Sequence, residues 1–71
     1  MAYKLYDIGN RIEKLRKAKG WSQNRLSIES GLAVNSVYLY EAQGTIPTLI
    51  SICSIAEALG VTVGYLIGEE D

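Results

Sequence analysis

Apolar residues recur along this chain at the spacing of one helix face. Near the N-terminus, Ile8, Ile12 and Leu15 lie at positions i, i+4 and i+7, with polar residues between them. Such a pattern is typical of a helix that packs one face on a core. It predicts a first helix from about Asp7 or Ile8 to Lys19, with Asp7 as a possible N-cap.

The middle of the chain predicts two short helices separated by a glycine turn. Ser22 can accept hydrogen bonds from the free N–H groups at the start of a helix from about Gln23 to Ser30. Gly31 can then adopt the positive φ that ends this helix, and a new helical period predicts a further helix from about Val34 to Ala42. Two helices joined in this way form a helix-turn-helix.

The two sides of this third helix differ in character. Ala33, Val37 and Tyr40 share one side and are expected to face the core. The other side is unusually apolar for a surface in water, and it carries Val34, Asn35, Tyr38, Leu39 and Ala42. We expect it to contact another molecule, either the major groove of DNA or a protein partner.

Asn35 and its apolar neighbours suit the reading of base edges. An asparagine amide can donate to and accept from one adenine at the same time, whereas Val34 and Leu39 can make only apolar contacts, such as those with thymine methyl groups. Tyr38 can reach a phosphate or pack on a sugar. The preceding helix starts with three polar residues, Gln23, Asn24 and Arg25. They can face a phosphate, or they can be ordinary solvated side chains.

Two charged residues flank apolar faces and therefore need partners. Arg16 borders the apolar stripe of the first helix, and Glu41 borders the core side of the third. A charge that loses water on burial is costly unless an opposite charge or a hydrogen bond compensates for it. An ion pair between Arg16 and Glu41 would satisfy both groups.

A fourth helix is predicted with Thr48 as its N-cap and Gly60 at its end. Its apolar stripe consists of five residues at helical spacing: Leu49, Ile52, Ile55, Ala56 and Leu59. Ile50 and Cys53 flank this stripe and could be exposed or lie in an interface. For Cys53, the expected role is that of a small buried hydrophobic side chain.

A short last helix is predicted from its cap, Thr62, to about Ile67. So short a helix is not expected to bury three large apolar residues within its own domain, yet it carries Tyr65, Leu66 and Ile67. We therefore expect some of these three residues in the interface of a homodimer.

Length and composition limit the chemistry that the chain can perform. With 71 residues it should form a single domain, with a core of about residues 7–67, a short arm of residues 1–6 and an acidic tail of residues 68–71. One cysteine and no histidine argue against an internal disulfide, a zinc site and a histidine-based catalytic dyad. We expect no enzymatic activity, metal or cofactor. Without a membrane-spanning apolar run or a secretion signal, the protein is expected to be cytoplasmic.

Charge is distributed unevenly along the chain, although the net charge is only −1. All seven lysine and arginine residues lie at or before Arg25, whereas six of the eight acidic residues follow it. A basic end, which includes Lys4, could meet DNA phosphates while the acidic tail stays away from them. The alternative is a solvated basic helix without a role in binding.

These features together resemble the phage-repressor and Cro type of helix-turn-helix, also called the xenobiotic-response-element family. The matching residues extend over nearly the whole chain: Ile8–Gly9, Arg11–Ile12, Leu15–Arg16, Gly20–Gln23, Leu26, Ser30–Leu32, Val37, Glu41, Pro47–Leu49, Ile55–Ala56 and Ala58–Thr62. The resemblance implies an all-α fold, a compact five-helix lambda-repressor-like domain with the helix-turn-helix at its second and third helices. It also implies a sequence-specific DNA-binding transcriptional regulator, a repressor, that binds operator DNA as a dimer with the third helix in the major groove.

Family roles carry over by position in this resemblance. Two sets of residues occupy the positions that contact bases and hold the DNA backbone: Val34, Asn35 and Leu39 for the bases, Gln43 and Thr45 for the backbone. Gln23 matches a residue that contacts phosphate and supports the neighbouring base-reading side chain, and Arg16 and Glu41 match a partly buried ion pair. The implied partners are double-stranded DNA and a second copy of the chain, with no small-molecule ligand.

The loop after the third helix departs from the family pattern. It lacks the usual lysine or arginine, so Gln43-Gly44-Thr45 can offer only neutral hydrogen bonds to phosphates. Ala33 also stands where a serine or threonine usually caps the third helix, which should cost about 1 kcal/mol. The uncharged loop and the apolar helix face favour an alternative function, a protein-interaction module such as an adapter, an antirepressor or an antitoxin-like partner.

Overall fold

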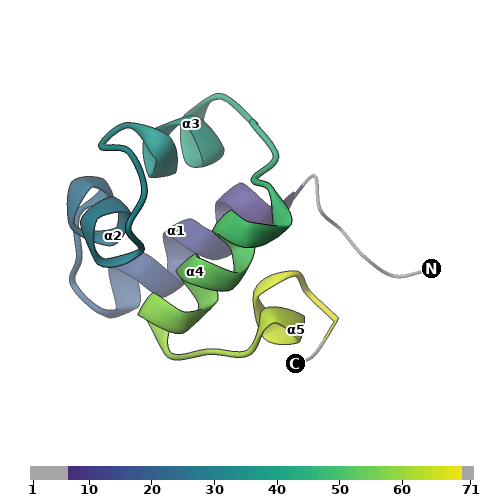
Figure 1. The fold of residues 1–71 in the computed structure, drawn as a ribbon. Coiled ribbons are helices and arrows are strands. Elements are labelled where there is room, and N and C mark those ends of the chain that lie inside the picture. Colours follow the sequence, from purple (N-terminus) through teal and green to yellow (C-terminus); the bar gives the residue numbers. More distant parts are fainter. Residues whose placement is uncertain (1–6, 70–71) are drawn as a thin grey trace.

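The fold consists of helices joined by short connections (Figure 1). The computed structural model describes residues 7–69, and within them it contains five helices and no strand: α1 (Ile8–Ala18), α2 (Gln23–Glu29), α3 (Ser36–Ala42), α4 (Leu49–Leu59) and α5 (Val63–Leu66). This confirms the predicted five-helix, all-α fold with a helix-turn-helix at α2 and α3. The arm of residues 1–6, with Lys4, and the last two residues of the acidic tail, Glu70 and Asp71, lie outside the described residues.

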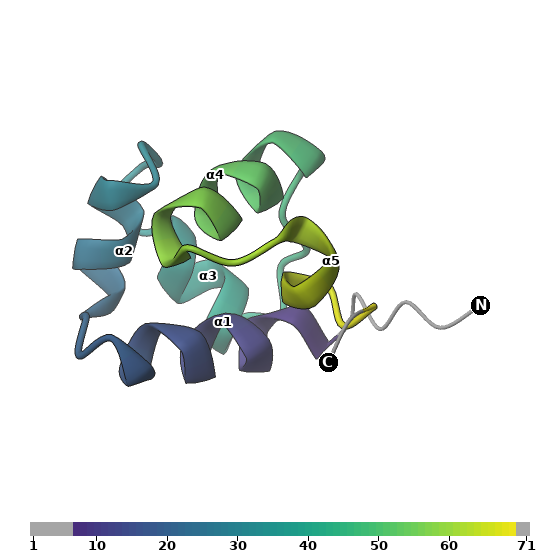
Figure 2. The ribbon, with the colours of Figure 1, turned by 90° about the horizontal axis from the view of Figure 1, so that it is seen from below.

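The main helix contacts close a ring around one core. Helix α1 packs on α3, α3 on α2, α2 on α4, α4 on α5, and α5 back on α1 (Figures 1 and 2). Every helix supplies at least one buried apolar side chain to this core: Ile8, Ile12, Leu26, Val37, Ile52, Ile55, Ala56, Leu59 and Leu66. No helix in the described range is both long and apolar enough to cross a membrane.

Three predicted N-caps are confirmed by side-chain hydrogen bonds. The hydroxyl oxygens of Ser22, Thr48 and Thr62 accept the backbone N–H three residues later, at 3.0, 3.2 and 3.0 Å. Each bond satisfies one of the N–H groups that a helix start leaves without an internal partner. The fourth predicted cap, Asp7, makes no capping bond, because its carboxylate accepts from the Asn10 amide at 2.9 Å.

Helix α3 starts later than predicted. Val34 and Asn35 form a turn ahead of the first helical residue, Ser36. Ala33 is exposed in this turn, so its expected place on the core side is wrong, whereas Val37 is buried and Tyr40 is half-buried as predicted. Because Ala33 precedes the helix, the helical spacing that placed it on the same side as Val37 does not apply to it.

Two predictions for α4 are wrong because no neighbouring helix covers its N-terminal part on one side. Leu49, the first residue of α4, is 70% exposed although it continues the apolar stripe, whereas Ile52 and Ile55 are buried. Cys53 is exposed rather than buried. It follows Leu49 by four residues and therefore lies on the same side of the helix.

Helix α5 buries more of its apolar surface than expected. Leu66 is fully buried, so it is not available for a dimer interface, and Tyr65 and Ile67 are half-buried. Arg11 of α1 holds this helix in place, because its guanidinium donates to the backbone oxygens of Tyr65 and Leu66 and lies 5.4 Å from the centre of the Tyr65 ring.

Gly9 sets the distance between α1 and α3. A methyl group at this position would overlap the backbone oxygen of Tyr40 and crowd the Cα of Glu41. We expect Gly9→Ala to destabilise the protein by about 1–3 kcal/mol, because the two helices must move apart. Urea unfolding followed by circular dichroism measures this change. Alanine favours a helix over glycine by up to about 1 kcal/mol, so a more stable variant would contradict the close approach.

Candidate nucleic-acid interface

The exposed side of α3 is apolar, as predicted. Val34, Tyr38 and Leu39 are 60%, 43% and 39% exposed, and Ala42 is exposed beside them. Large apolar side chains gathered on a surface mark a site of contact with another molecule. The third helix therefore has an outer face that can make van der Waals contacts over its whole length.

Asn35 is the polar group of this face, and its amide is not used by the helix. It occupies the N-cap position of α3, with φ −91° and ψ 0°, yet its side chain makes no capping hydrogen bond. It is also exposed. The donor and acceptor of this amide therefore remain available to a base edge at the start of the helix.

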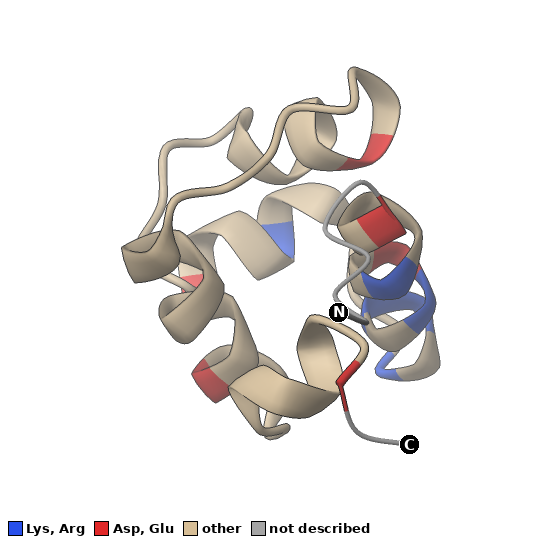
Figure 3. Ribbon diagram, turned by 90° about the vertical axis from the view of Figure 1, so that its right-hand side faces the viewer, with Lys and Arg blue, Asp and Glu red and all other residues tan. Residues whose placement is uncertain are grey.

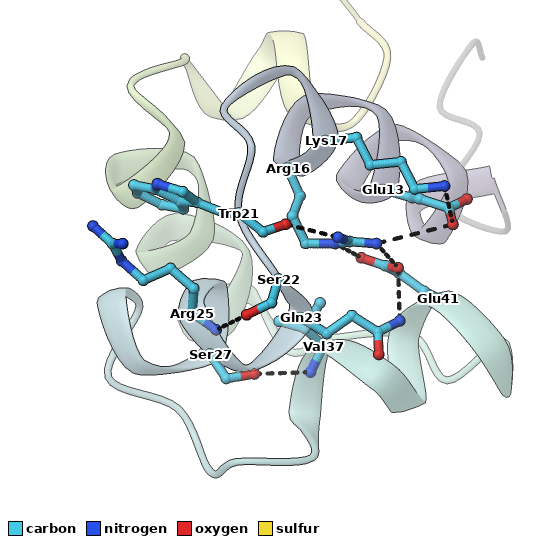
Figure 4. Close-up of polar contacts among 10 residues, drawn as sticks. All are labelled: Glu13, Arg16, Lys17, Trp21, Ser22, Gln23, Arg25, Ser27, Val37 and Glu41. Carbon is cyan, nitrogen blue, oxygen red and sulfur yellow. Dashed lines mark hydrogen bonds and ion pairs between the residues drawn. The ribbon is translucent and has the colours of Figure 1, made fainter.

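Ser27 of α2 caps α3 in place of a local side chain. Its buried hydroxyl accepts the N–H of Val37, the second residue of α3, at 3.3 Å (Figure 4). This bond fixes the start of α3 against α2. It also reduces the loss of stability that follows from having Ala33 at the usual capping position. The sequence analysis did not predict this role of Ser27; a small hydroxyl residue beside Leu26, on the buried side of α2, was the available signal.

A buried ion pair connects α1 to α3. The Arg16 guanidinium binds both carboxylate oxygens of Glu41, at 2.8 and 2.9 Å, and also donates to the backbone oxygen of Trp21 at 2.8 Å (Figure 4). The two side chains are only 9% and 4% exposed. The hydrogen bond to Glu41 raises the pKa of Arg16 above its ordinary value, against the opposing effect of burial. The predicted pair is thus present and bidentate.

Gln23 extends this ion pair to α2. Its amide nitrogen donates to the Glu41 carboxylate at 2.9 Å, and the side chain is half-buried. Part of the amide that was expected to face a phosphate is thus bound within the protein. Through this bond, Gln23 holds the start of α2 beside the C-terminal end of α3.

Arg25 is bound on its own helix rather than free beside α3. Its guanidinium pairs with Glu29 at 2.8 Å and lies 4.9 Å from the centre of the Trp21 ring. Both partners of the ion pair are exposed, so this pair is worth little and can exchange for a phosphate. Asn24 is exposed next to it.

Most of the predicted basic end is engaged within the protein. Lys17 pairs with Glu13 at 3.2 Å, Lys19 lies 4.9 Å from the Trp21 ring, and Arg11 holds α5. Of the basic residues that the structure describes, all but Arg25 lie on α1 or directly after it, and α3 carries none (Figure 3). Between Glu29 and Glu57, Glu41 is the only charged residue of the sequence, and it is buried. The outer face of α3 is therefore uncharged.

Gln43 and Thr45 follow α3 in an exposed loop. The backbone N–H groups of both residues donate to the carbonyl oxygen of Leu39, at 3.1 and 3.3 Å. These two bonds end α3 and fix the start of the loop, in which Gln43 and Thr45 are exposed. They can offer only neutral hydrogen bonds.

Comparison with known proteins agrees with this geometry. The sequence model of the helix-turn-helix family matches residues 12–66. A crystal structure of a hypothetical transcription factor, NHTF from Neisseria, superposes with a TM-score of 0.82 at 31% identity, covering 90% of this chain and 75% of that one. The restriction-modification controller protein C.AhdI from Aeromonas hydrophila gives 0.80 at 35% identity, covering 87% and 94%.

A third similar protein is SinR. Its N-terminal DNA-binding domain from Bacillus subtilis superposes with a TM-score of 0.79 at 29% identity, covering 86% of this chain and 90% of that one. SinR, described as the master regulator for biofilm formation, is also known in complex with DNA, and that structure gives 0.76 at 32% identity over 83% and 95%. The search of curated proteins gave no match.

Loss of the Glu41 charge should destabilise the domain strongly. Glu41→Gln removes the buried counter-charge of the Arg16 guanidinium and leaves it only the exposed Glu13 carboxylate at 4.0 Å, and we expect the free energy of unfolding to fall by about 3–5 kcal/mol. Urea unfolding measures it. The matched control is Glu29→Gln, which breaks the exposed pair with Arg25 and should cost less than about 1 kcal/mol. Equal losses in the two variants would contradict the importance of burial at Glu41.

Proposed function

The chain belongs to the helix-turn-helix family, and on that premise we propose that it binds operator DNA as a dimer, with α3 in the major groove. It is a DNA-binding transcriptional regulator, as are the proteins that it resembles. A dimer of this kind would hold its two copies of α3 about 34 Å apart, one helical turn of DNA. The role would place the protein with the DNA, in the cytoplasm.

The observation that carries this proposal is the free amide of Asn35 on an apolar, uncharged helix face. An amide presented at the start of a groove-binding helix can bind adenine through two hydrogen bonds. Val34 and Leu39 beside it would contact thymine methyl groups. The operator half-site should therefore contain A·T pairs opposite these three residues.

Backbone contacts would come from neutral groups around this face. Gln43 and Thr45 would donate to phosphates from the loop, Tyr38 would reach a phosphate or pack on a sugar, and Asn24 would bind at the start of α2. Arg25 would add one positive charge once it leaves Glu29. Such contacts position the helix without large electrostatic attraction. Sequence preference would then depend on base contacts and on DNA shape.

Asn35→Ala tests the base contact. We expect a loss of about 1–3 kcal/mol on the preferred site and a relaxed preference at a single base pair, because one bidentate contact disappears. Fluorescence anisotropy with the preferred site, with variants of it and with scrambled DNA measures both effects. Asn24→Ala serves as the control and should weaken binding to all these sequences alike. An equal loss on scrambled DNA with Asn35→Ala would show that Asn35 reads no base.

Selection from a random DNA pool, followed by a salt series, tests the proposal as a whole. We expect enrichment of an A·T-containing two-fold site and a weak salt dependence, with a logarithmic slope of about −2, because Arg25 would be the one positive charge that each of two copies brings to the DNA. If no sequence is enriched and no salt-dependent binding is found, the protein is not this kind of regulator, and the role of a protein-interaction module takes its place. A steep slope would instead show that further basic residues of the protein make most of the contacts with DNA phosphates.

A further inference from the structure

Two cavities adjoin on the surface between α1 and α5. One has a volume of about 220 Å³ and is lined by Asp7, Asn10, Arg11, Lys14, Leu15 and Tyr65. The other has a volume of about 410 Å³ and is lined by Leu15, Gly60, Val61, Thr62 and Tyr65. Because Leu15 and Tyr65 line both cavities, the two form one depression, which we call the α1–α5 groove. It runs along α1 beside the turn from α4 to α5 (Figure 2).

The two ends of the α1–α5 groove differ in chemistry. One end carries the cations of Arg11 and Lys14, which are three residues apart and therefore share one side of α1. The other end is lined by Leu15 and Val61, two half-buried apolar side chains that pack against the core. A molecule that fills the groove should therefore be charged at one end and apolar at the other.

Both cations can bind an anion without giving up an ion pair. Lys14 is exposed and has no ion-pair partner within residues 7–69. Arg11 uses two of the five N–H groups of its guanidinium for backbone oxygens of α5, which carry no formal charge. Asp7 is the one carboxylate of the lining; it accepts from Asn10 and lies two helical turns, about 10 Å, from Lys14. The lining therefore has a net positive charge.

We propose that the α1–α5 groove binds a small organic anion, a carboxylate with an apolar chain. The carboxylate accepts hydrogen bonds from Arg11 and Lys14, and the chain lies between Leu15 and Tyr65 and ends at Val61. A single negative charge matches the net charge of the lining, whereas a phosphate dianion exceeds it. The volume of the groove is typical of small-molecule sites, which measure about 300–1,000 Å³ and combine apolar walls with a few polar groups.

The α1–α5 groove is separate from the helix-turn-helix. Lys14 and Arg16 are two residues apart, about 200° around α1, so the groove and the Arg16–Glu41 pair lie on opposite sides of this helix. No residue of α3 lines the groove. The inference therefore goes beyond DNA binding and does not depend on it. A failure of the proposed function leaves this site untouched, and the reverse also holds.

A series of ligands with different chain lengths tests the apolar end. Hexanoate and octanoate are titrated, below the concentrations at which they form micelles, into isotope-labelled protein. We expect saturable shifts of the amide NMR signals of Lys14, Leu15, Val61 and Tyr65. The Kd of octanoate should be about tenfold lower than that of hexanoate, because two more CH₂ groups are buried. Acetate, which offers the carboxylate alone, should cause no shift at the same concentrations.

Two results of this series would overturn the site. If the two chain lengths give the same Kd, the chain does not lie in the apolar end. If the shifts centre on Leu49 and Ile50, which are 70% and 79% exposed on α4, the ligands bind to exposed apolar side chains in general.

Loss of the Lys14 charge tests the polar end. Lys14→Gln should weaken octanoate binding about two- to fivefold, the effect of a partly exposed ion pair. It should leave the binding of octanol unchanged, because the alcohol carries no charge. The matched control is Lys17→Gln, which removes a lysine that pairs with Glu13 outside the groove and should change neither affinity. Circular dichroism checks that both variants fold. If Lys14→Gln weakens octanoate and octanol alike, or neither, the carboxylate is not held by Lys14 and the proposal fails.

Discussion

The ion pair between Arg16 and Glu41 is the interaction on which the arrangement of the helix-turn-helix depends. Arg16 also binds the carbonyl oxygen of Trp21 in the turn before α2, and Glu41 also accepts from Gln23 at the start of α2. Two charged side chains therefore connect α1, the α1–α2 turn, α2 and α3. Because both are buried, neither can be removed without leaving a desolvated partner. The orientation of α3 relative to α2 follows from this constraint together with the Ser27 cap.

The same pair explains why the outer face of α3 has no charge. Glu41 is the single charged residue of its part of the chain, and it points inward to Arg16. What remains outside is one amide, Asn35, among apolar side chains. Such a face gains little from the general attraction between cations and DNA phosphates, which is the same for every DNA sequence. Its discrimination must come from hydrogen bonding and shape at the base edges.

Interactions within a few residues of each other could be predicted from the sequence, whereas coverage by distant helices could not. The caps at Ser22, Thr48 and Thr62 depend on a side chain and an N–H three residues away, and all three are confirmed. The Arg16–Glu41 pair could also be predicted, because each charged residue borders an apolar stripe of its helix. The exposure of Leu49 and the burial of Leu66 depend on which helices lie over them, and helical spacing does not contain that information. The place of Asn35 ahead of α3 depends on Ser27, a residue of another helix.

Weak electrostatic attraction can still accompany selective binding to one site. The outer face of α3 carries no charge with which to hold any DNA. In the proposed complex, affinity then comes from base contacts at the two half-sites of one operator, and DNA that offers a single half-site supports only half of them. The lack of charge around α3 then favours the complete operator over the large excess of other DNA, because non-specific binding is the part that electrostatic attraction would have strengthened.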